Sequence, residues 1–399
     1  MQELVPSLVR KSDSKIVLLV LDGLGGVRTS SRGTELSEAN TPNLDRMAAD
    51  GMSGLHTVVG PGITPGSGAG HMALFGYDPV QYLLGRGALS AAGVAFDLRP
   101  GDVAARVNFC TLDRDGRVID RRAGRIPTEE NVRLCKILLE NIKMEGDVEL
   151  FLETERDHRA LLVLRGMGLS ADIKDTDPGV IGITPNPPIA RAPEAAGTVI
   201  MLQRILDQVR LILAGEQANF LLLRGFDTLR PIEPFAVRYL LKARGAASYP
   251  MYRGLSKLVG MDVAAETAGW EQTVEDMKAH WNDYDYFFLH QKPTDSAGED
   301  GDYSRKIAAI EQVDRTIPGI LALNPGVVCV TGDHATPAAF RRHSWHPVPF
   351  LMWGENVGVD LVDRFDEEAA RLGGFGHQQA KDLMAFMLAA TMRLGTYGA

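Results

Sequence analysis

Three short stretches of the chain are almost entirely apolar, and all three stop at polar residues. They are Lys15–Leu21, Tyr284–His290 and Gly326–Thr331, rich in aliphatic or aromatic side chains. Continuous apolar runs of this length are typical of strands buried on both faces, as in a parallel sheet covered by helices. The pattern therefore predicts an α/β fold with a mostly parallel sheet flanked by helices.

Helical signals occur between and after these strands. Thr41 followed by Pro42 predicts a helix start, and Gly51 predicts its end. Apolar spacing predicts further helices over 72–78, 303–314 and 378–392. The helix that follows residue 71 would direct its first amide groups at Ser67 and favour an anion there.

The pattern changes between residues 98 and 230. Apolar and polar residues alternate around Val103–Phe109, and Asp113–Gly116 reads as a turn, which predicts antiparallel hairpins. Strands near 148–152 and 160–164 and helices over 129–141 and 195–214 complete this part. Because the buried-strand pattern resumes only afterwards, we expect residues 98–230 to form a smaller α/β domain inserted into a domain made of residues 1–97 and 231–399.

Composition narrows the classes of function. The 399 residues carry a formal net charge of −9, which argues against a broad nucleic-acid surface but allows a local basic pocket for an anionic substrate. Three distant cysteines give neither a disulfide framework nor a zinc knuckle. No signal-peptide core or membrane-spanning run is present in the sequence, so we expect a cytoplasmic protein with no membrane partner.

Ser67 lies in a stretch of small and turn-forming residues, Ile63–His71. Such a backbone bends sharply and leaves its amide groups accessible, so the hydroxyl of Ser67 is presented rather than packed. A serine needs activation to act as a nucleophile, and the Gly-x-Ser-x-Gly pattern is missing because position 65 is Pro. A metal ion is the other activator. An ordinary glycine-rich surface loop is the alternative interpretation.

Acidic and imidazole residues follow each of the three apolar strands. Asp22 follows the first, Asp295 and Glu299 the second, and Asp333 with His334 the third. In one parallel sheet these groups would gather at the carboxyl edge, together with Ser67 and His343. So many oxygen and nitrogen donors repel one another unless divalent cations lie between them. Each residue alone has a structural reading, whereas the combination indicates a two-metal site for phosphoryl transfer.

Arginines could bind the anionic groups of a substrate. Arg86 lies between two glycines. Arg121, Arg122 and Arg125 cluster within Val118–Ile126, and Arg106, Arg165 and Arg224 lie elsewhere in the predicted insert 98–230. Guanidinium groups bind phosphate and carboxylate in a bidentate manner. A solvated charged face is the alternative interpretation, and Arg253 is a weaker candidate.

These motifs together resemble the cofactor-independent phosphoglycerate mutases, archaeal-type branch, within the alkaline phosphatase superfamily. The residues that carry the resemblance are Asp22–Gly25, Asn40–Asp45, Thr64–His71, Leu84–Gly87, Thr294–Asp300, Gly332–Pro337 and His343–Pro349. The resemblance runs in order from about residue 15 to 390. It implies an alkaline-phosphatase-like domain interrupted by a smaller insert, and interconversion of 2-phosphoglycerate and 3-phosphoglycerate through a phosphoserine, without 2,3-bisphosphoglycerate.

The resemblance also implies roles for individual residues. Asp22, Ser67, Asp333 and His334 correspond to the ligands of one metal, with Ser67 as the nucleophile. Asp295 and His343 correspond to ligands of the other. The substrate-binding residues that it implies are His71, Arg86, Arg121, Arg122 and Arg125. Arg253 is an additional candidate from the sequence alone, and Asp120 is our candidate for the acid that handles the glycerate hydroxyl proton.

The chain departs from the family pattern at one ligand position. The usual Asp-x-x-Gly-His motif has histidine where this chain has Glu299. A carboxylate is a harder donor, so we expect Mn²⁺ as the first choice for the two metal ions, with Mg²⁺, Zn²⁺ or Co²⁺ also compatible. The alternatives are a phosphomonoester hydrolase or another phosphomutase on the same scaffold, or a non-catalytic metal-binding relative.

Overall fold

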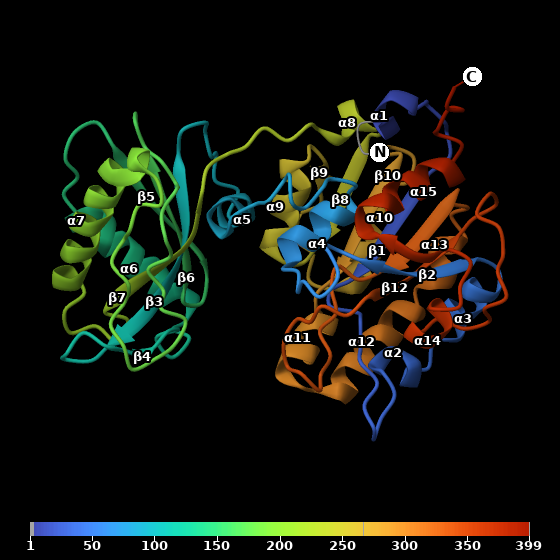
Figure 1. The fold of residues 1–399 in the computed structure, drawn as a ribbon, viewed down its shortest axis with the longest axis horizontal. Coiled ribbons are helices and arrows are strands. Elements are labelled where there is room, and N and C mark those ends of the chain that lie inside the picture. The colour runs from blue at the N-terminus through green and yellow to red at the C-terminus, as the bar shows by residue number, and fades with distance from the viewer. Residues whose placement is uncertain (1–3, 266, 399) are drawn as a thin grey trace. The chain divides into compact units, whose positions relative to one another are not determined.

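The structure is a computed structural model that describes residues 4–265 and 267–398. The chain divides into two compact units (Figure 1): a larger one up to Leu83 and from Ile232 onward, and a smaller one, Leu84–Pro231. The smaller unit begins before residue 98, where the sequence pattern places the start of the insert. The reason is helix α5 (Arg86–Gly93), because its Ala91 packs against Ala104, Leu161 and Val163 of the smaller unit.

The larger unit contains an eight-stranded sheet. In order across the sheet, its strands are β13 (Gly376–Gln379), β2 (Met52–Thr57), β12 (Val348–Trp353), β11 (Val327–Thr331), β1 (Ile16–Leu21), β10 (Tyr286–Gln291), β8 (Ala243–Ala247) and β9 (Asp262–Val263). Strand β12 is antiparallel to both of its neighbours, and the remaining pairs are parallel. The sheet is therefore mostly parallel, as predicted.

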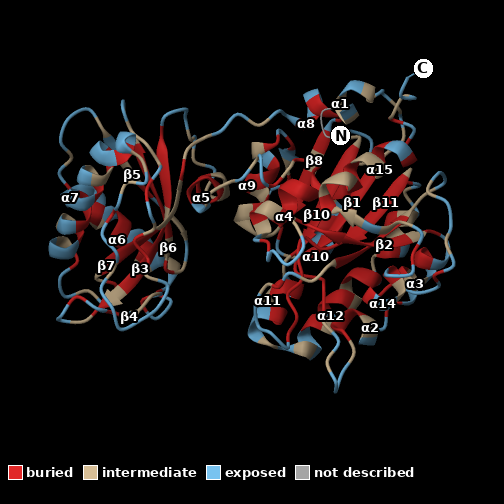
Figure 2. Cartoon of the chain, viewed as in Figure 1, coloured by how far each residue is buried: buried red, intermediate tan, exposed pale blue. Residues whose placement is uncertain are grey.

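The three predicted apolar strands lie side by side at the centre of this sheet. Strand β1 pairs in parallel with β10 and β11, and all residues of the three strands are buried. Figure 2 shows this buried sheet in red. The register places Val20 opposite both His290 and Thr331, so the three strands end at the same edge. This edge carries the residues that follow the strands.

Helices cover the sheet of the larger unit. They are α1 (Leu4–Leu8), α2 (Glu35–Glu38), α3 (Pro42–Ala49), α4 (Ser67–Leu74), α8 (Phe235–Arg238), α9 (Pro250–Leu258), α10 (Trp270–Ala279), α11 (Pro293–Asp300), α12 (Tyr303–Asp314), α13 (Ile317–Leu321), α14 (Glu367–Ala370), the 3-10 turn Ala380–Asp382 and α15 (Leu383–Ala390). Alternate residues of β1, such as Val17 and Leu19, share a core with Met47, Trp270 and Ile310. Burial of these apolar faces is the main force that stabilises the unit.

Two predicted helices have different boundaries in the structure. Helix α4 begins at Ser67 and not at Met72, so the serine is itself the first helical residue. The predicted helix over 378–392 begins only at Leu383, because Gly376–Gln379 pair with Gly54–Thr57 as strand β13. The predicted helices after Thr41 and over 303–314 are confirmed.

The smaller unit has an antiparallel sheet with its own core. Its elements besides α5 are β3 (Val103–Leu112), β4 (Val118–Asp120), α6 (Thr128–Asn141), β5 (Glu149–Arg156), β6 (Arg159–Arg165), the 3-10 turn Pro193–Ala195, α7 (Ala196–Ile212) and β7 (Phe220–Asp227). Strand β3 pairs with β4, β6 and β7. The predicted hairpin strands and the helices over 129–141 and 195–214 are confirmed, with ends shifted by a few residues.

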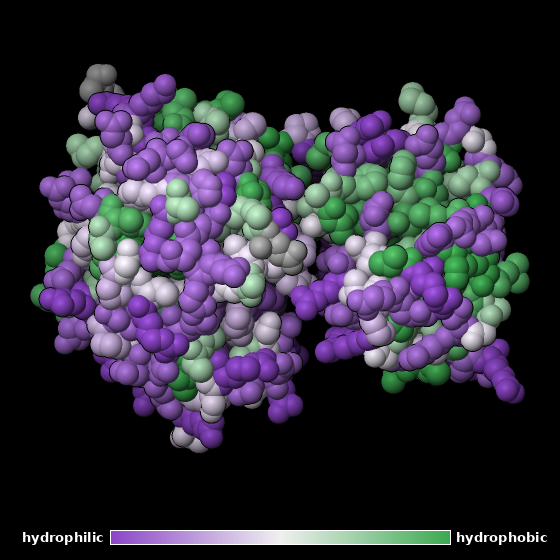
Figure 3. Space-filling view, turned by 180° about the vertical axis from the view of Figure 1, so that it is seen from behind, coloured by the Kyte–Doolittle hydropathy of each residue, from purple (hydrophilic) through white to green (hydrophobic). Residues whose placement is uncertain are grey.

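The surface of the described residues is mixed. Figure 3 shows mostly hydrophilic surface on the larger unit and broader hydrophobic areas on the smaller one. The smaller unit exposes apolar side chains at Val180, Ile181 and Ile183, in a loop that hydrogen-bonds to Val118 of β4. Among the described residues, no helix has the length and apolar character needed to cross a membrane.

Candidate active site

Asp22 is the first residue after strand β1, and its side chain is fully buried. Its Oδ2 atom accepts hydrogen bonds from the Tyr252 hydroxyl and from Lys292 Nζ at 3.0 Å, and lies 3.2 Å from His290 Nε2. Its Oδ1 atom has no hydrogen-bond partner and lies 3.3 Å from His334 Nε2. Although burial opposes ionisation, the charge of Lys292 and the His290 hydrogen bond hold the pKa of Asp22 well below its usual value.

Asp333 and His334 follow strand β11 at the same edge, and both are fully buried. Asp333 Oδ1 accepts a hydrogen bond from the Gly23 amide at 3.0 Å, which connects the loops after β11 and β1. Asp333 Oδ2 lies 3.2 Å from His334 Nε2 and has no hydrogen-bond partner. Asp22, Asp333 and His334 therefore form a first cluster whose ligand atoms lie within 4.8 Å of one another.

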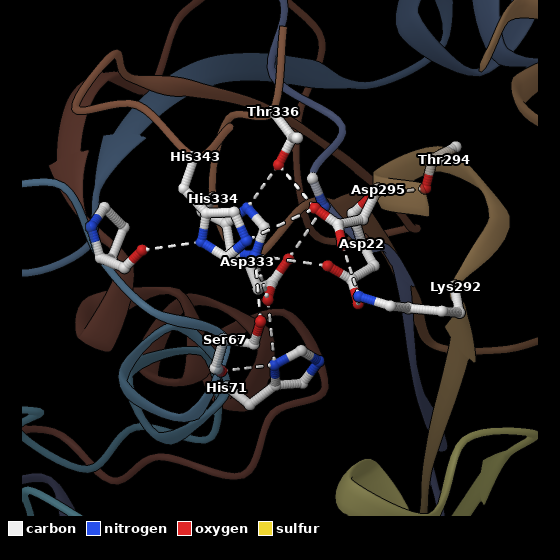
Figure 4. A network of polar contacts seen from close by, with 12 residues as sticks. Asp22, Ser67, His71, Lys292, Thr294, Asp295, Asp333, His334, Thr336 and His343 are labelled. Atoms are coloured by element: carbon white, nitrogen blue, oxygen red, sulfur yellow. Dashed lines mark hydrogen bonds and ion pairs between the residues drawn. The ribbon is translucent and has the colours of Figure 1, made fainter. Parts of the chain in front are cut away.

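Asp295, His334 and His343 form a second cluster with the same spacing. Asp295 Oδ1 lies 3.6 Å from His343 Nε2, and the rings of His334 and His343 stack with their centroids 3.7 Å apart. The Thr336 hydroxyl donates to Asp295 Oδ1 at 2.7 Å and lies 3.0 Å from His334 Nδ1. His334 thus belongs to both clusters, as Figure 4 shows.

Glu299 lies at the rim of the second cluster. Asp295 and Glu299 are four residues apart on α11 and therefore share one face of the helix. Glu299 Oε1 lies 3.9 Å from His343 Nε2, and its side chain is 55% exposed. The carboxylate is outside the compact cluster but within reach of the same imidazole nitrogen as Asp295.

The donor atoms of both clusters fit divalent cations. Buried carboxylate oxygens without hydrogen-bond partners are costly unless a positive charge balances them. Here Asp22 Oδ1 and Asp333 Oδ2 are such atoms, and they converge on an imidazole nitrogen. Carboxylate and imidazole without thiolate suit Mn²⁺, Mg²⁺, Zn²⁺ or Co²⁺.

Ser67 faces the first cluster from helix α4. Its Oγ lies 3.2 Å from His334 Nε2, and the residue is only partly buried. The close approach depends on Gly70, because a Cβ atom there would collide with the backbone carbonyl of Asp333. Ser67 is the first residue of α4, and the amide groups at a helix N-terminus favour an anion beside it.

His71 has a different place from the one that the resemblance implies. Its ring is 0% exposed, so it does not face a substrate. Its Nδ1 lies 2.8 Å from the Ser67 carbonyl oxygen and 3.2 Å from Asp333 Oδ2. Burial works against protonation, but Asp333 and Asp22 raise the pKa of His71 above its ordinary value. His71 therefore contacts Asp333 from within the core of the larger unit.

Lys292 and Tyr252 also belong to the site and were not predicted from the sequence. Lys292 follows β10 and donates to Asp22 at 3.0 Å and to Asp295 at 2.5 Å. Burial favours the neutral amine, but Asp22, Tyr252 and Asp295 raise the pKa of Lys292 well above its usual value, so the ammonium stays charged. Lys292 follows a buried strand, as the acidic residues of the site do, and this position is the sequence signal that could have identified it. No sequence signal distinguishes Tyr252.

Two of the predicted substrate-binding residues already have partners within the smaller unit. Arg121 forms two hydrogen bonds with Asp177 at 2.9 and 2.8 Å. Asp120 accepts the amide hydrogens of Arg122 and Gly124 at 2.8 and 2.6 Å. Asp120 thus stabilises a turn and is not the free acid that we expected, because both of its oxygens are engaged. Arg122 and Arg125 are exposed on this turn.

A second set of arginines lies on the face of the sheet that α5 partly covers. We call it the Arg106 cluster, and it consists of Arg86, Arg106 and Arg224. Arg106 and Arg224 are opposite each other on β3 and β7. Arg106 Nε is buried without a hydrogen-bond partner, and Arg224 Nε lies 3.4 Å from Asp177 Oδ2. Burial, followed by the charge of Arg86, lowers the pKa of Arg106 to about 10.

Arg253 belongs to the larger unit and is the last predicted substrate-binding residue. It follows Tyr252 on α9, and its Nε is buried without a hydrogen-bond partner. The sequence therefore identified the acidic and imidazole residues that converge, together with Ser67. A run of arginines in the sequence does not reveal that Arg121 is already neutralised by Asp177, and the residues that bind the substrate stay a prediction.

Comparison with known proteins places the chain in a family. The model of the 2,3-bisphosphoglycerate-independent phosphoglycerate mutases matches residues 48–219. A Thermus thermophilus protein named as a probable member is 45% identical over 397 residues, 98% of each chain. An Aquifex aeolicus protein with the same name is 43% identical over the full length of both chains.

Solved structures agree with this. The structure of a Pyrococcus horikoshii protein has a TM-score of 0.80 at 30% identity and covers 97% of this chain and 99% of its own. The cofactor-independent phosphoglycerate mutase of Thermoplasma acidophilum has a TM-score of 0.70 at 30% identity, covering 95% of this chain and 100% of its own. With relatives of this identity and coverage, the chain belongs to the 2,3-bisphosphoglycerate-independent phosphoglycerate mutases, a family of isomerases.

Proposed function

We propose that this protein interconverts 2-phosphoglycerate and 3-phosphoglycerate through a phosphoserine on Ser67. The observation that carries the proposal is the position of Ser67 Oγ, 3.2 Å from His334 Nε2 in the first acidic and imidazole cluster. A hydroxyl at a helix N-terminus beside this cluster is placed to accept a phosphoryl group.

Two divalent cations fit the donor atoms of this site. Asp22, Ser67, Asp333 and His334 would hold one of them, and Asp295, Glu299 and His343 the other. Bound cations of this kind lower the pKa of a nearby hydroxyl and neutralise charge that develops during phosphoryl transfer. Because Glu299 adds a carboxylate, we expect Mn²⁺ to be preferred.

The phosphoryl group moves in two balanced steps. In the first, the Ser67 hydroxyl loses its proton and the bond between Ser67 Oγ and phosphorus forms as the bond from phosphorus to one glycerate oxygen breaks; that oxygen gains a proton in place of the one that Ser67 gave up. In the second, the other glycerate hydroxyl loses its proton and forms a bond to phosphorus as the bond from phosphorus to Ser67 Oγ breaks, and Ser67 Oγ regains a proton. Lys292 stays an ammonium ion and so contributes positive charge, not a base, beside Asp22 and Asp295.

The Arg106 cluster is our candidate for binding the anionic groups of the substrate. Arg106 and Arg224 have buried Nε atoms without hydrogen-bond partners, and the charge of Arg86 adds to theirs. Guanidinium groups held close together in this way repel one another, and a carboxylate or phosphate between them relieves the repulsion. Arg253 is the corresponding candidate in the larger unit.

The test is the reaction itself, with Mn²⁺ supplied. 3-Phosphoglycerate should be converted to 2-phosphoglycerate, measured by coupling to enolase, and Ser67→Ala should lower the rate at least about a thousandfold. Ser304→Ala is the matched control, because Ser304 is exposed on α12. Mass spectrometry of protein quenched during turnover should find phosphate on Ser67. Activity that survives in Ser67→Ala, or release of free phosphate as the main product, would contradict the proposal, the latter in favour of a hydrolase.

A further inference from the structure

Among the charged side chains that are buried in the larger unit outside the two clusters, three contact the loops that carry the ligands. They are Glu35 on α2, Lys306 on α12 and Glu367 on α14, with exposed fractions of 2%, 0% and 8%. Burying charges costs free energy even when they are paired, and well-packed apolar residues in the same place often stabilise a fold at least equally. The contacts of these three side chains therefore call for another explanation.

Lys306 connects the two loops that follow β1 and β11. Its Nζ donates to the carbonyl oxygen of Thr336 at 2.9 Å and to that of Gly25 at 3.3 Å. Gly25 lies three residues after Asp22, and Thr336 lies two residues after His334. One ammonium group thus holds the backbone of both ligand-bearing loops.

The two glutamates bind the same loops as Lys306. Glu35 Oε2 lies 3.7 Å from Lys306 Nζ, and Glu35 Oε1 accepts the amide hydrogen of Ala338 at 2.7 Å. Glu367 Oε1 accepts the amide hydrogen of Gly26 at 2.7 Å, and its Oε2 accepts from the Thr34 hydroxyl at 2.5 Å. Each carboxylate therefore fixes one backbone amide of a ligand-bearing loop.

Thr336 transmits this arrangement to the clusters. Its carbonyl oxygen is held by Lys306, and its hydroxyl contacts both Asp295 Oδ1 and His334 Nδ1. A shift of its backbone would move a hydroxyl that orients a ligand from each cluster. Partners that orient metal ligands in this way typically change metal affinity 10–100-fold when they are removed.

We propose that Lys306, together with Glu35 and Glu367, is a positioning group that sets the affinity of the two clusters for divalent cations. The proposal rests on the cation sites of the proposed function. It explains why charged groups are buried at this point: they satisfy backbone groups of two loops that must keep a fixed spacing. None of the three belongs to either of the two clusters.

The test measures Mn²⁺ binding directly, without turnover. Metal-free full-length protein is titrated with Mn²⁺, and free Mn²⁺ is followed by its electron paramagnetic resonance signal. Lys306→Met should weaken Mn²⁺ binding about 10–100-fold. That change leaves the buried carboxylate of Glu35 without a positive partner. The double variant Lys306→Met with Glu35→Gln removes both charges, so we expect it to fold, and it serves as the second test protein. It should show the same loss, and saturating Mn²⁺ should restore kcat in both variants.

Arg244→Met is the matched control. Arg244 forms a half-buried bidentate pair with Asp276 at 2.7 Å, on β8 and α10, and contacts neither ligand-bearing loop. It should lower the melting temperature and leave Mn²⁺ affinity unchanged. Wild-type Mn²⁺ affinity in both Lys306 variants, while Ser67 remains essential, would overturn the positioning role alone. If the wild-type protein bound no Mn²⁺, the cation sites and this inference would both be overturned.

Discussion

At the scale of a single residue, Glu299 is the position where we expect the metal preference of the second cluster to be set. Its carboxylate and that of Asp295 approach the same nitrogen of His343, at 3.9 and 3.6 Å. An imidazole in place of Glu299 is a softer donor that favours Zn²⁺ over Mn²⁺. We therefore expect Glu299→His to raise the affinity for Zn²⁺ relative to Mn²⁺ about tenfold, measured by competition with a chromophoric chelator.

Asp300→His provides the comparison for that change. Asp300 lies next to Glu299 on α11, but its side chain is 62% exposed and pairs with Arg305. A histidine there should leave the Zn²⁺ to Mn²⁺ ratio as it is. Equal ratios in the Glu299 variant and the wild-type protein would show that Glu299 is not a ligand.

His56 makes stability depend on pH. It is fully buried on β2, with Nε2 2.9 Å from the Thr331 hydroxyl, and burial lowers its pKa to about 4. In the unfolded chain its pKa is about 6.5, so protons favour unfolding below that value. The free energy of unfolding should fall by about 3 kcal/mol as the pH drops from about 6.5 to below 4.

His56→Gln separates this contribution from that of other groups. Glutamine does not titrate and keeps a donor for Thr331. Urea unfolding between pH 7.5 and 4 should show a flatter pH dependence for the variant. Parallel curves for the two proteins would assign the acid sensitivity to other residues.

The sequence identified residues whose role follows from their place after a strand. Asp22, Asp333 and His334 follow buried strands, and parallel strands bring such residues to one edge. His71 and Arg121 were assigned differently from what the structure shows. Their roles depend on burial and on partners far away in the sequence, Asp333 and Asp177, which no local pattern reveals.

Helix α4 shows how an element can bring a residue to the site. Its sequence, Ser-Gly-Ala-Gly-His-Met-Ala-Leu, contains two glycines that weaken a helix, which is why the pattern predicts a later start. Gly70 has no Cβ where the Asp333 backbone passes. Packing against the loop after β11 therefore overrides the low helix propensity and places Ser67 beside His334.

Gly70→Ala tests this packing. The added methyl group has to displace either α4 or the Asp333 loop, at a cost of about 1–3 kcal/mol. We expect lower stability in urea unfolding and weaker Mn²⁺ binding. Gly66→Ala is the control in the same loop, because a Cβ there meets nothing within 4 Å; it should stay close to the wild-type protein. A Gly70 variant that matched this control would show that the close approach is not required.

Other elements could not be predicted from local pattern. Helix α11 reads Pro-Thr-Asp-Ser-Ala-Gly-Glu-Asp and has no apolar stripe, so nothing in its sequence suggests a helix. Strand β13 contains only Gly, His and Gln, and forms because β2 offers it a backbone to pair with. In both cases tertiary contacts determine the structure.

At the scale of the whole molecule, the chain consists of one unit made from two segments and one continuous unit. The sequence predicts the return to the larger unit at residue 231, because buried strands resume there. It places the departure too late, since α5 lacks the alternation that characterises the smaller unit and joins it through packing on β3, β6 and β7. Contacts, and not composition, determine that boundary.

The smaller unit should fold by itself. Residues 84–231 are continuous and have their own core, which includes Phe109, Leu134, Leu162 and Leu206. A fragment of these residues should unfold cooperatively in urea, as single domains of this size do. A fragment without a cooperative transition would show that this core needs the larger unit.

The same fragment tests the Arg106 cluster without the catalytic serine. Inorganic phosphate should bind between the arginines and raise the melting temperature by a few degrees, because a ligand that binds only the folded state stabilises it. Arg106→Gln should remove most of this effect, since it takes away the guanidinium whose Nε lacks a partner. Arg133→Gln should not, because Arg133 is exposed and paired with Glu130 and Glu216. If phosphate stabilised all three fragments equally, or none, the anion site would have to lie elsewhere than on these strands.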